Sequence, residues 1–350
     1  MAPPDRILLI RLKSIGDILF ALPAVHLVRA NFPGAHIAFM VSKENAPVLQ
    51  GFAEVQDILP LDRALYRWNN LKAMCVETLA LIRRLRRQKF SLVVDFQGYG
   101  ETALLTWLTG APERWGNVYR ATRAWAYTRK MARRDFVHPA EGNLSLLHQC
   151  GLKPSPVLNK FVLPDTALEE ARGFFTTHGL APTRPTLFIQ PFTSSPQKNW
   201  PLEKQMAVGR HWQARGVQVL FGGGPAERAA LEPARQAGFP VSAGVPLLVN
   251  CGVMKLCTLV LGGDTGVMHT AVAMDKRVLM LINATTPGRP HPFQHPEWTV
   301  TPPAGQPVSA TSVEAVNEGC AQALAELGAV AGPGQKQARY WSSGAEARPV

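Results

Sequence analysis

The stretch "ILLIRLKSIGDILFALPAV", residues 7–25, decides how this chain begins to fold. Its aliphatic run at 7–12 predicts a buried strand, and the residues from about 16 to 31 predict a helix after a short glycine-containing loop. In many nucleotide-binding proteins a loop at this place binds phosphate at a helix N-terminus. Here the loop carries a carboxylate, Asp17, which would repel phosphate. The sequence therefore predicts an α/β unit whose first loop has a different role.

Short aliphatic strands alternate with helical stretches along most of the chain. Further strands are expected at 37–41, 92–95, 187–189, 217–221, 259–261 and 278–281. Further helices are expected at 71–88, 101–109, 167–177, 202–213, 226–237, 267–273 and 312–327. The last of these helices is expected to begin with the capping box Thr311-x-x-Glu314. This alternation predicts the α/β class, with mostly parallel sheets and helices on both faces.

The alternation is interrupted once, by a proline-containing stretch from 153 to 185, and then restarts. We therefore expect two Rossmann-like domains, at 1–165 and 186–327, with a linker at 166–185 and a flexible tail at 328–350. Ligands of open α/β sheets lie beyond the carboxyl ends of the strands. Two such domains facing each other would therefore form a binding cleft.

The composition narrows the class of protein. The 350 residues are 46% hydrophobic and 18% charged, as in a soluble globular protein. No apolar run reaches the roughly 18 residues of a membrane span, and the N-terminus lacks the pattern of a secretory signal. The five cysteines contain no CxxC pair, so we expect neither a metal site nor a disulfide framework. These features predict a cytoplasmic protein with reduced thiols.

The formal net charge of +12 favours anionic partners: nucleic acid, phospholipid headgroups or a phosphorylated substrate. Basic residues gather at 83–89 and at 114–134. The first group continues an apolar helical pattern, so its charges can also belong simply to the solvated face of a helix, without an anionic partner. In the second group aromatic residues are interleaved, a mixture that also suits single-stranded nucleic acid.

Four stretches that follow expected strands carry polar or glycine residues, and such loops often carry function. They are Ser14–Asp17, "QPFTSSPQKNWP" (190–201), "FGGGPAER" (221–228) and "GGDTGVMHTA" (262–271). In the last stretch, Asp264, Thr265 and Gly266 stand where the free N–H groups of the next helix can receive a phosphate. A simple cap for that helix is the structural alternative. His269, one turn further on, is either a site residue or a helix histidine with a local partner.

The stretches at 221–228 and 190–201 indicate a ligand site less strongly. In 221–228 three consecutive glycines, Gly223 among them, permit close approach of a nucleotide. Glu227 can accept hydrogen bonds from ribose hydroxyls or favour the helix N-terminus.

The stretch at 190–201 combines hydroxyls with a cation. Thr193 and Ser194 are hydroxyl donors in a loop before Lys198. A lysine in this place can act as a point charge on a diphosphate, although an isolated loop lysine is usually just solvated.

Together these motifs resemble glycosyltransferase family 9, the lipopolysaccharide core heptosyltransferase family. The resemblance rests on "ILLIRLKSIGDILFALPAVHLVRANFPGAHIAFMV", "KNWPLEKQMAV", "GGGPAER" and "GGDTGVMHTAVAMDKRVLML", which stand in the family's order and cover residues 5–327 approximately. It implies a GT-B fold, in which two Rossmann-like domains face each other across a cleft. The first would bind the acceptor and the second the nucleotide sugar.

The resemblance also implies roles for individual residues. Asp17 matches the family's proposed catalytic base, and Lys198 matches the lysine that contacts the donor diphosphate. Asp17 then lies across the cleft from the phosphates, so repulsion is no objection. Further donor contacts are expected from Thr193, Ser194, Gly223, Glu227, Asp264, Thr265, Gly266 and His269. Acceptor contacts are expected from Arg11, Lys13, Ser14, Gly16, Arg120 and Arg123.

The implied reaction is a single displacement that inverts the anomeric centre. No metal or other cofactor is expected, because cationic groups of the protein can take the diphosphate charge. The expected donor is ADP-heptose, and the expected acceptor is a phosphorylated or acidic lipid-linked saccharide of the lipopolysaccharide core. The basic residues would hold that acceptor and dock the protein peripherally on the inner face of the plasma membrane. Nucleic acid is not an expected partner.

One stretch departs from the family's pattern and leaves alternatives open. In "INATTPGRP" (282–290), Asn283 and Thr286 stand where the family often has glycine and aspartate. A related transferase that uses a UDP- or GDP-linked sugar for surface polysaccharide is the first alternative. A nucleotide-sugar epimerase would need additional acids in the cleft. A nucleic-acid-binding protein would show salt-dependent oligonucleotide binding and would not need Asp17.

Overall fold

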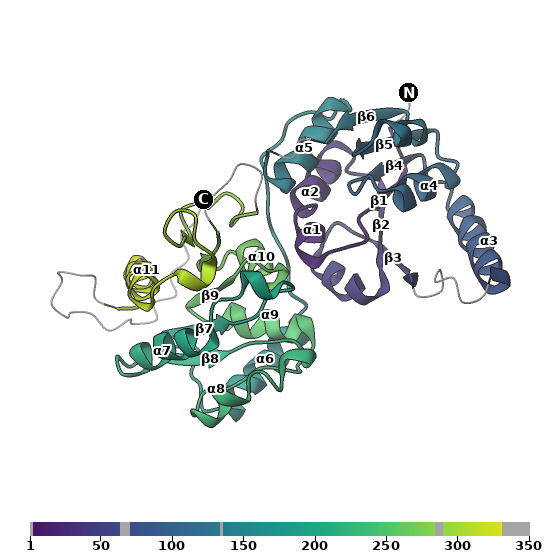
Figure 1. Ribbon diagram of the computed structural model, residues 1–350. Helices are drawn as coiled ribbons and strands as arrows, with labels where there is room; N and C mark the ends of the chain where they lie inside the picture. Colours follow the sequence, from purple (N-terminus) through teal and green to yellow (C-terminus); the bar gives the residue numbers. More distant parts are fainter. Residues whose placement is uncertain (1–2, 64–70, 134–135, 284–289, 331–350) are drawn as a thin grey trace, which may run out of the picture.

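The computed structural model describes residues 3–63, 71–133, 136–283 and 290–330, with the side chains of 71–75 left aside. Within these residues the chain forms two α/β lobes, each built on a parallel sheet, that lie side by side (Figure 1). Three features of the sequence lie outside them: Arg134, the last residue of the basic stretch 114–134, Thr286, and the tail beyond residue 330.

The first lobe is built on a six-stranded parallel sheet of strand order β3-β2-β1-β4-β5-β6. Its strands are β1 (Arg6–Ile10), β2 (His36–Ser42), β3 (Asp57–Leu61), β4 (Leu92–Asp95), β5 (Glu113–Val118) and β6 (Arg129–Ala132). Its α-helices are α1 (Ile15–Leu19), α2 (Leu22–Asn31), α3 (Leu71–Arg87), α4 (Gly100–Leu108) and α5 (Pro139–Gln149). Two 3-10 helices, η1 (Lys43–Gly51) and η3 (Ala121–Ala126), complete it.

The second lobe has a five-stranded parallel sheet of strand order β11-β10-β9-β7-β8. Its strands are β7 (Thr186–Gln190), β8 (Gln218–Phe221), β9 (Leu259–Gly263), β10 (Val278–Leu281) and β11 (Thr299–Val300). Its α-helices are α6 (Asp165–Thr177), α7 (Leu202–Gln213), α8 (Glu232–Gln236), α9 (Leu247–Leu256), α10 (Gly266–Ala273) and α11 (Val313–Glu326). Short 3-10 turns form η4 (Pro196–Lys198), η5 (Pro225–Glu227) and η6 (Val308–Ala310).

Both sheets have the strand order of a doubly wound fold. An isolated bridge between Phe221 and Val241 continues the second sheet beyond β8. When this bridge is counted as a strand, the order is 3-2-1-4-5-6 in each lobe. The expected α/β class, with parallel sheets, is confirmed. The exact division of the chain into domains stays a prediction.

Three local expectations were wrong. The helix expected at 16–31 is two helices, α1 and α2, because Pro23 lies in the first turn of α2 and has no N–H for a helix interior. The helix expected at 226–237 is only the 3-10 turn η5 and the short α8. The cap of α11 is Ser312 rather than Thr311, since the Ser312 hydroxyl accepts a backbone hydrogen bond of 3.1 Å.

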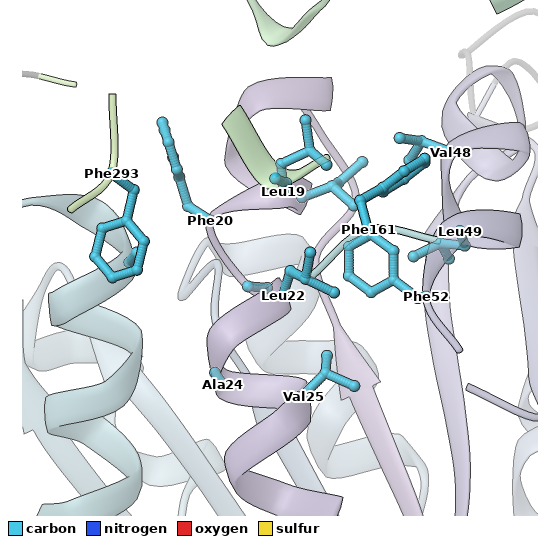
Figure 2. Close-up of a cluster of buried hydrophobic side chains, with 14 of the residues drawn as sticks. Leu19, Phe20, Leu22, Ala24, Val25, Val48, Leu49, Phe52, Phe161 and Phe293 are labelled. Carbon is cyan, nitrogen blue, oxygen red and sulfur yellow. The ribbon is translucent and has the colours of Figure 1, made fainter. Parts of the chain in front are cut away.

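Apolar side chains pack the lobes directly against each other (Figure 2). Phe161, in the chain that crosses from α5 to α6, packs edge-on against Phe52, the residue after η1, with ring centroids 6.3 Å apart. Its N–H donates to the carbonyl oxygen of Ala273 in the second lobe at 2.8 Å. On the other side of α1, Phe293 of the second lobe lies across from Phe20 (Figure 2). The ends of α1 and η1 are therefore held against the second lobe.

The helices and cysteines of the described residues bear on what the sequence predicts about membrane spans and disulfides. None of the helices in these ranges is long and apolar enough to cross a bilayer. The cysteines with described side chains, 150, 251, 257 and 320, are all free and buried. Burial raises the pKa of each of these thiols, to about 11 for Cys150 and about 12 for Cys251 and Cys320, so they are poor nucleophiles.

Candidate active site

The expected site residues lie at the carboxyl edges of the two sheets. In the first lobe the loops that follow β1 and β4 are neighbours at the point where the strand order reverses. In the second lobe the loops that follow β7 and β9 are neighbours in the same way. Asp17, Lys198 and Asp264 lie in or just after these loops. Such switch points are where doubly wound sheets bind their ligands.

Asp17 lies in the first turn of α1 and is held from two sides. Its Oδ1 is 2.8 Å from Nη2 of Arg11, and its Oδ2 accepts hydrogen bonds from the N–H and hydroxyl of Ser14 at 3.1 and 3.3 Å. The side chain is still 35% exposed. Ser14 is the N-cap of α1, and Asp17 is the N3 residue of its capping box. A carboxylate has about four lone-pair sites, so this role leaves room for a ligand hydroxyl.

Arg11 fixes the orientation of that carboxylate. The Arg11 side chain is only 9% exposed, and its Nη1 donates to the carbonyl oxygen of Phe96, after β4, at 2.9 Å. The guanidinium thus bridges the loop after β4 and Asp17. Because a charge-assisted bond is stronger than a neutral one, this bridge restricts the carboxylate to one position.

Asp17 opens onto a pocket formed by the first lobe. The pocket is lined by Arg11, Asp17, Phe96, Asn117, Met131, Arg133, Val137, Pro139, Gly142 and Asn143. Asn117, on β5, is 6% exposed, and its Oδ1 has no hydrogen-bond partner among the described residues. A buried polar atom usually has a partner, so this oxygen is a point at which a ligand can bind. The pocket combines a carboxylate, two guanidinium groups and two amides.

A second polar cluster lies in the second lobe. Nζ of Lys198 donates to Oδ2 of Asp264 at 2.6 Å, and Nε2 of His269 is 3.1 Å from Oδ1 of the same carboxylate. Burial alone would raise the pKa of Asp264, but hydrogen bonds from His269 and Lys198 lower it to about 2. Asp264 is therefore charged at neutral pH and holds Lys198 in place. An ammonium has three N–H donors, so Lys198 can bind an anion as well.

The N-terminus of α10 adds backbone donors beside Lys198. Its N-cap, Thr265, makes no side-chain capping bond. The loop after β7 comes so close to the end of β9 that a β-carbon on Gly263 would lie 2.8 Å from the Thr193 methyl and 3.1 Å from the carbonyl oxygen of Lys198. A helix start with free N–H groups and a lysine at its side suits a phosphate or diphosphate.

The starts of α1 and α10 touch, and this contact joins the two clusters. A β-carbon placed on Gly266 would lie 2.8 Å from the backbone nitrogen of Gly16 and 2.8 Å from Cβ of Ile15. One turn away, Phe20 packs edge-on against His269 with centroids 4.6 Å apart. Substrates must therefore bind beside this contact and not between the two helix starts.

Comparison with known proteins decides the family. A model of glycosyltransferase family 9 (heptosyltransferase) matches residues 78–311, about two thirds of the chain. The chain belongs to glycosyltransferase family 9. It is 26% identical to lipopolysaccharide heptosyltransferase 3 of Escherichia coli, over 77% of this chain and 81% of that protein.

Solved structures agree on the fold. A family 9 glycosyl transferase from Veillonella parvula superimposes with a TM-score of 0.82 at 19% identity, covering 92% of this chain and 97% of that one. The Escherichia coli heptosyltransferase WaaC, solved with ADP-2-deoxy-2-fluoro heptose, superimposes with a TM-score of 0.72 at 19% identity, covering 91% and 99%. The GT-B fold and the assignment as a glycosyltransferase, both implied by the sequence motifs, are confirmed.

In this transferase the two expected hydroxyls before Lys198 differ in their surroundings. The Thr193 hydroxyl lies within hydrogen-bond distance of the Ser195 carbonyl oxygen, at 2.8 Å, and of Asn199 Oδ1, at 3.0 Å. It therefore shapes the loop that presents the lysine. Ser194 is exposed on the same loop. Direct contact of either hydroxyl with the donor stays a prediction.

Glu227 of the transferase holds its own turn. Its Oε2 accepts the N–H of Gly224 at 2.7 Å, and a β-carbon on Gly223 would lie 3.0 Å from the same oxygen. The structural alternative, a carboxylate that stabilises a helix start, is thus present in the fold. The expected contact with the donor ribose stays a prediction.

The expected acceptor residues are only partly gathered around Asp17. Arg11 and Ser14 bind Asp17 directly, whereas Lys13 and Arg120 are exposed. Arg123 donates to the carbonyl oxygen of Gly98 at 3.1 Å and is absent from the pocket lining described above.

The sequence reasoning did not single out two polar residues that line this pocket as site candidates, Asn117 and Asn143, and it counted Arg133 only among a basic cluster. Asn143 donates from Nδ2 to the carbonyl oxygen of Phe20 at 3.0 Å. Asn117 lies on β5 and Arg133 follows β6, two strands without a clear apolar pattern. The position of Arg133 directly after β6 marks it only once that strand is known.

Proposed function

We propose that this family 9 enzyme transfers heptose from ADP-heptose, with inversion, to a phosphorylated or acidic lipid-linked saccharide of the lipopolysaccharide core. Support comes from the relative named above, a lipopolysaccharide heptosyltransferase, and from the similar WaaC structure with an ADP-heptose analogue. The observation that carries the proposal is geometric. Asp17 and the Lys198–Asp264 pair flank one contact between the lobes, the contact of α1 with α10.

In this reaction the acceptor hydroxyl attacks the anomeric carbon. Asp17 takes the hydroxyl proton as the new carbon–oxygen bond forms. The bond between the anomeric carbon and the diphosphate oxygen breaks, and its electron pair leaves with ADP. Negative charge therefore grows in the second lobe, where Lys198 and the N–H groups of α10 stabilise it. With this cation and these N–H donors in place, the reaction needs no metal.

The acceptor binds in the pocket beside Asp17. Arg11 and Arg133 suit the phosphate or carboxylate groups of such a saccharide, and the unpaired Oδ1 of Asn117 suits one of its hydroxyls. Because the acceptor is lipid-linked, the enzyme works at the inner face of the plasma membrane as a peripheral protein.

A transferase that uses a different nucleotide sugar is the second candidate. The Asn283 side chain, at the departure from the family's motif, accepts the N–H of Val308 at 3.0 Å and so joins the end of β10 to the start of η6. Calorimetry with ADP-, UDP- and GDP-sugars separates the two candidates. Tight binding confined to ADP-heptose supports heptosyl transfer, whereas preference for a UDP- or GDP-sugar overturns it.

The role of Asp17 has its own test. The variant Asp17→Asn should bind ADP-heptose as the wild type does but lose about 100-fold or more in turnover, the usual range for a lost general base. Asp165→Asn is a matched control, since Asp165 is also an acid in the first turn of a helix but is exposed at the start of α6. Turnover of Asp17→Asn within a few-fold of the control would show that Asp17 serves only the capping box.

A further inference from the structure

Helix α3 lies at the outer side of the first lobe, away from the second lobe (Figure 1). From residue 76 onward, where its side chains are described, only Leu85 is buried. Val76 is 63% exposed and Leu79, one turn later, is 50% exposed. The helix thus presents apolar side chains to solvent over consecutive turns, which indicates that something else covers them.

The apolar exposure continues onto α4 and η3. Leu104 and Trp107 of α4 are 46% and 48% exposed, and Trp125 of η3 is 55% exposed. The two indole rings pack edge-on with centroids 5.8 Å apart, so they form one patch. A cavity between α3 and α4 is lined by Leu81, Ile82, Leu104, Leu105 and Leu108, among others, and links the patch to α3. We call Val76, Leu79, Leu104, Trp107 and Trp125 the α3–α4 surface.

Positive charge lies beside this surface. The C-terminal part of α3 and the residue that follows Gln88 expose Arg83, Arg84, Arg86, Arg87 and Lys89. The sequence from 78 to 89 contains no acid. Nε of Arg86 donates to the carbonyl oxygen of Leu108 at 3.2 Å, which places this basic group at the end of α4.

Two of the acids near the surface are neutralised, whereas Glu77 of α3 and Glu44 of the cavity lining are exposed. Glu101 is paired with Arg63 at 3.1 Å, and Asp62 with Lys43 at 3.0 Å. The five exposed basic side chains of 83–89 therefore outnumber the two exposed acids, Glu77 and Glu44. The surface combines exposed tryptophans, an amphipathic helix and excess positive charge.

We propose that the α3–α4 surface docks the enzyme on an anionic lipid bilayer. Tryptophan side chains favour the boundary between headgroups and acyl chains, and basic residues near it are attracted to anionic headgroups. A second copy of the chain fits less well, since it would bring two arginine clusters together. The inference goes beyond the proposed function, because it names the surface that meets the membrane and does not depend on the donor.

One end of the α3–α4 surface reaches the sheet edge that carries the acceptor pocket. The cavity under it is also lined by Glu44, Asp62 and Glu101, which follow the carboxyl ends of β2, β3 and β4. Asp17 follows the carboxyl end of β1 in the same parallel sheet. The start of α3, with Val76, lies toward this edge, whereas Trp107, Trp125 and the arginines come just before β5, β6 and β4 and so lie toward the opposite edge. A bilayer on the α3–α4 surface would therefore run along the outer side of the first lobe, and the acceptor would reach the pocket around the carboxyl edge.

Co-sedimentation with vesicles tests the proposal. The wild type should bind vesicles of phosphatidylcholine with about one third phosphatidylglycerol, and not phosphatidylcholine alone. The double variant Trp107→Ser/Trp125→Ser should bind about tenfold more weakly. Arg83→Gln/Arg87→Gln should lose about 25-fold, or about fivefold for each charge, and binding should weaken with salt.

Matched variants on other surfaces serve as controls. Val157→Ser/Leu158→Ser removes side chains that are 40% and 53% exposed in the chain between α5 and α6. Arg172→Gln/Arg210→Gln removes two exposed charges on α6 and α7. Both should bind like the wild type. Unchanged ADP binding shows that each variant is folded. A further measurement uses the wild type alone: lipids brominated near the headgroup should quench its tryptophan fluorescence, because Trp107 and Trp125 would lie at that depth.

The proposal is wrong if the tryptophan and arginine variants bind vesicles as the wild type does, or if the controls lose as much. It is also wrong if the variants only convert a dimer into monomers, because the surface then contacts a second copy. Vesicle binding is measured without donor, so its failure is distinct from failure of heptosyl transfer.

Discussion

A single methyl group at Gly266 should separate the two lobes at the active site. In Gly266→Ala the new β-carbon would lie 2.8 Å from the backbone nitrogen of Gly16 and 2.8 Å from Cβ and Cγ2 of Ile15. Two of these neighbours are fixed in the backbone or attached directly to it, so they cannot rotate away. The start of α1 must move relative to α10 to make room.

The expected magnitude follows from two opposing effects. An alanine near the start of a helix is favoured over glycine by about 0.5–1 kcal/mol. Overpacking of a tight contact costs about 1–3 kcal/mol. The variant should therefore be less stable than the wild type by about 1 kcal/mol, where helix propensity alone predicts a gain. A displacement of about 1 Å between reacting groups can cost about 100-fold in rate, so turnover should fall more than stability does.

Gly16→Ala is the matched control on the other side of the same contact. Its β-carbon would lie 3.6 Å from Cα of Gly266 and 3.7 Å from Cδ2 of His269, which are ordinary van der Waals distances. Urea denaturation and steady-state transfer from ADP-heptose measure both variants. Gly16→Ala should retain wild-type stability. If Gly266→Ala is as stable and as active as Gly16→Ala, the lobes do not touch here in solution and the reasoning fails.

Three further outcomes are expected. Lys198→Ala should weaken ADP-heptose binding by about tenfold or more in calorimetry, because a charge-assisted contact to the diphosphate is lost; unchanged affinity would exclude that contact. Burial is the main reason why the pKa of His138 falls to about 3, and repulsion from His291 and His269 adds to it. Below pH 6.5 the unfolded chain therefore binds a proton at this histidine, whereas the folded protein does not. Stability should therefore fall as pH drops from 6.5 toward 3, by up to about 1.4 kcal/mol per unit, and His138→Gln should show a shallower slope in denaturation curves. Tyr127→Phe removes a 2.7 Å hydrogen bond to the fully buried Asp95 and should lower the free energy of unfolding by about 1–3 kcal/mol; a stability equal to wild type would contradict this.

The loops after β1 and β9 could be predicted as site loops because each follows an uninterrupted run of apolar residues. Asp17 follows β1 and Asp264 follows β9, and all but the first residue of β1 and all of β9 are buried. A strand buried on both faces reads as an apolar run, and in a parallel sheet its carboxyl end points toward the ligand. The position of a loop in the sequence was therefore enough to mark it.

Strands β5 and β6 lacked that signal, and the pocket beside Asp17 was missed with them. Their sequences, "ERWGNV" and "RKMA", contain charges and no apolar run. Each forms because the strand before it in the sheet offers free backbone groups, which is a tertiary effect. Asn117 and Arg133 could be placed beside Asp17 only once these strands were known.

The pairing of Lys198 with Asp264 could not be read from the sequence either. Sixty-six residues separate them, and β8 comes between β7 and β9 along the chain. In the sheet β8 lies outside β7, so the loops after β7 and β9 become neighbours. Both residues were expected to contact the donor, but the structure shows that Asp264 is bound to the lysine and to His269.

The relative position of acid and lysine is set by packed groups. Asp17 lies on α1, and the residue after this helix, Phe20, packs against His269 at 4.6 Å. His269 bonds to Asp264 at 3.1 Å, and Asp264 to Lys198 at 2.6 Å. An inverting displacement needs its base and its leaving-group cation in register at the same moment. Because each group in this series is held by the next, a change in lobe contact at α1 must displace the acid and the cation relative to each other, even when neither is altered itself.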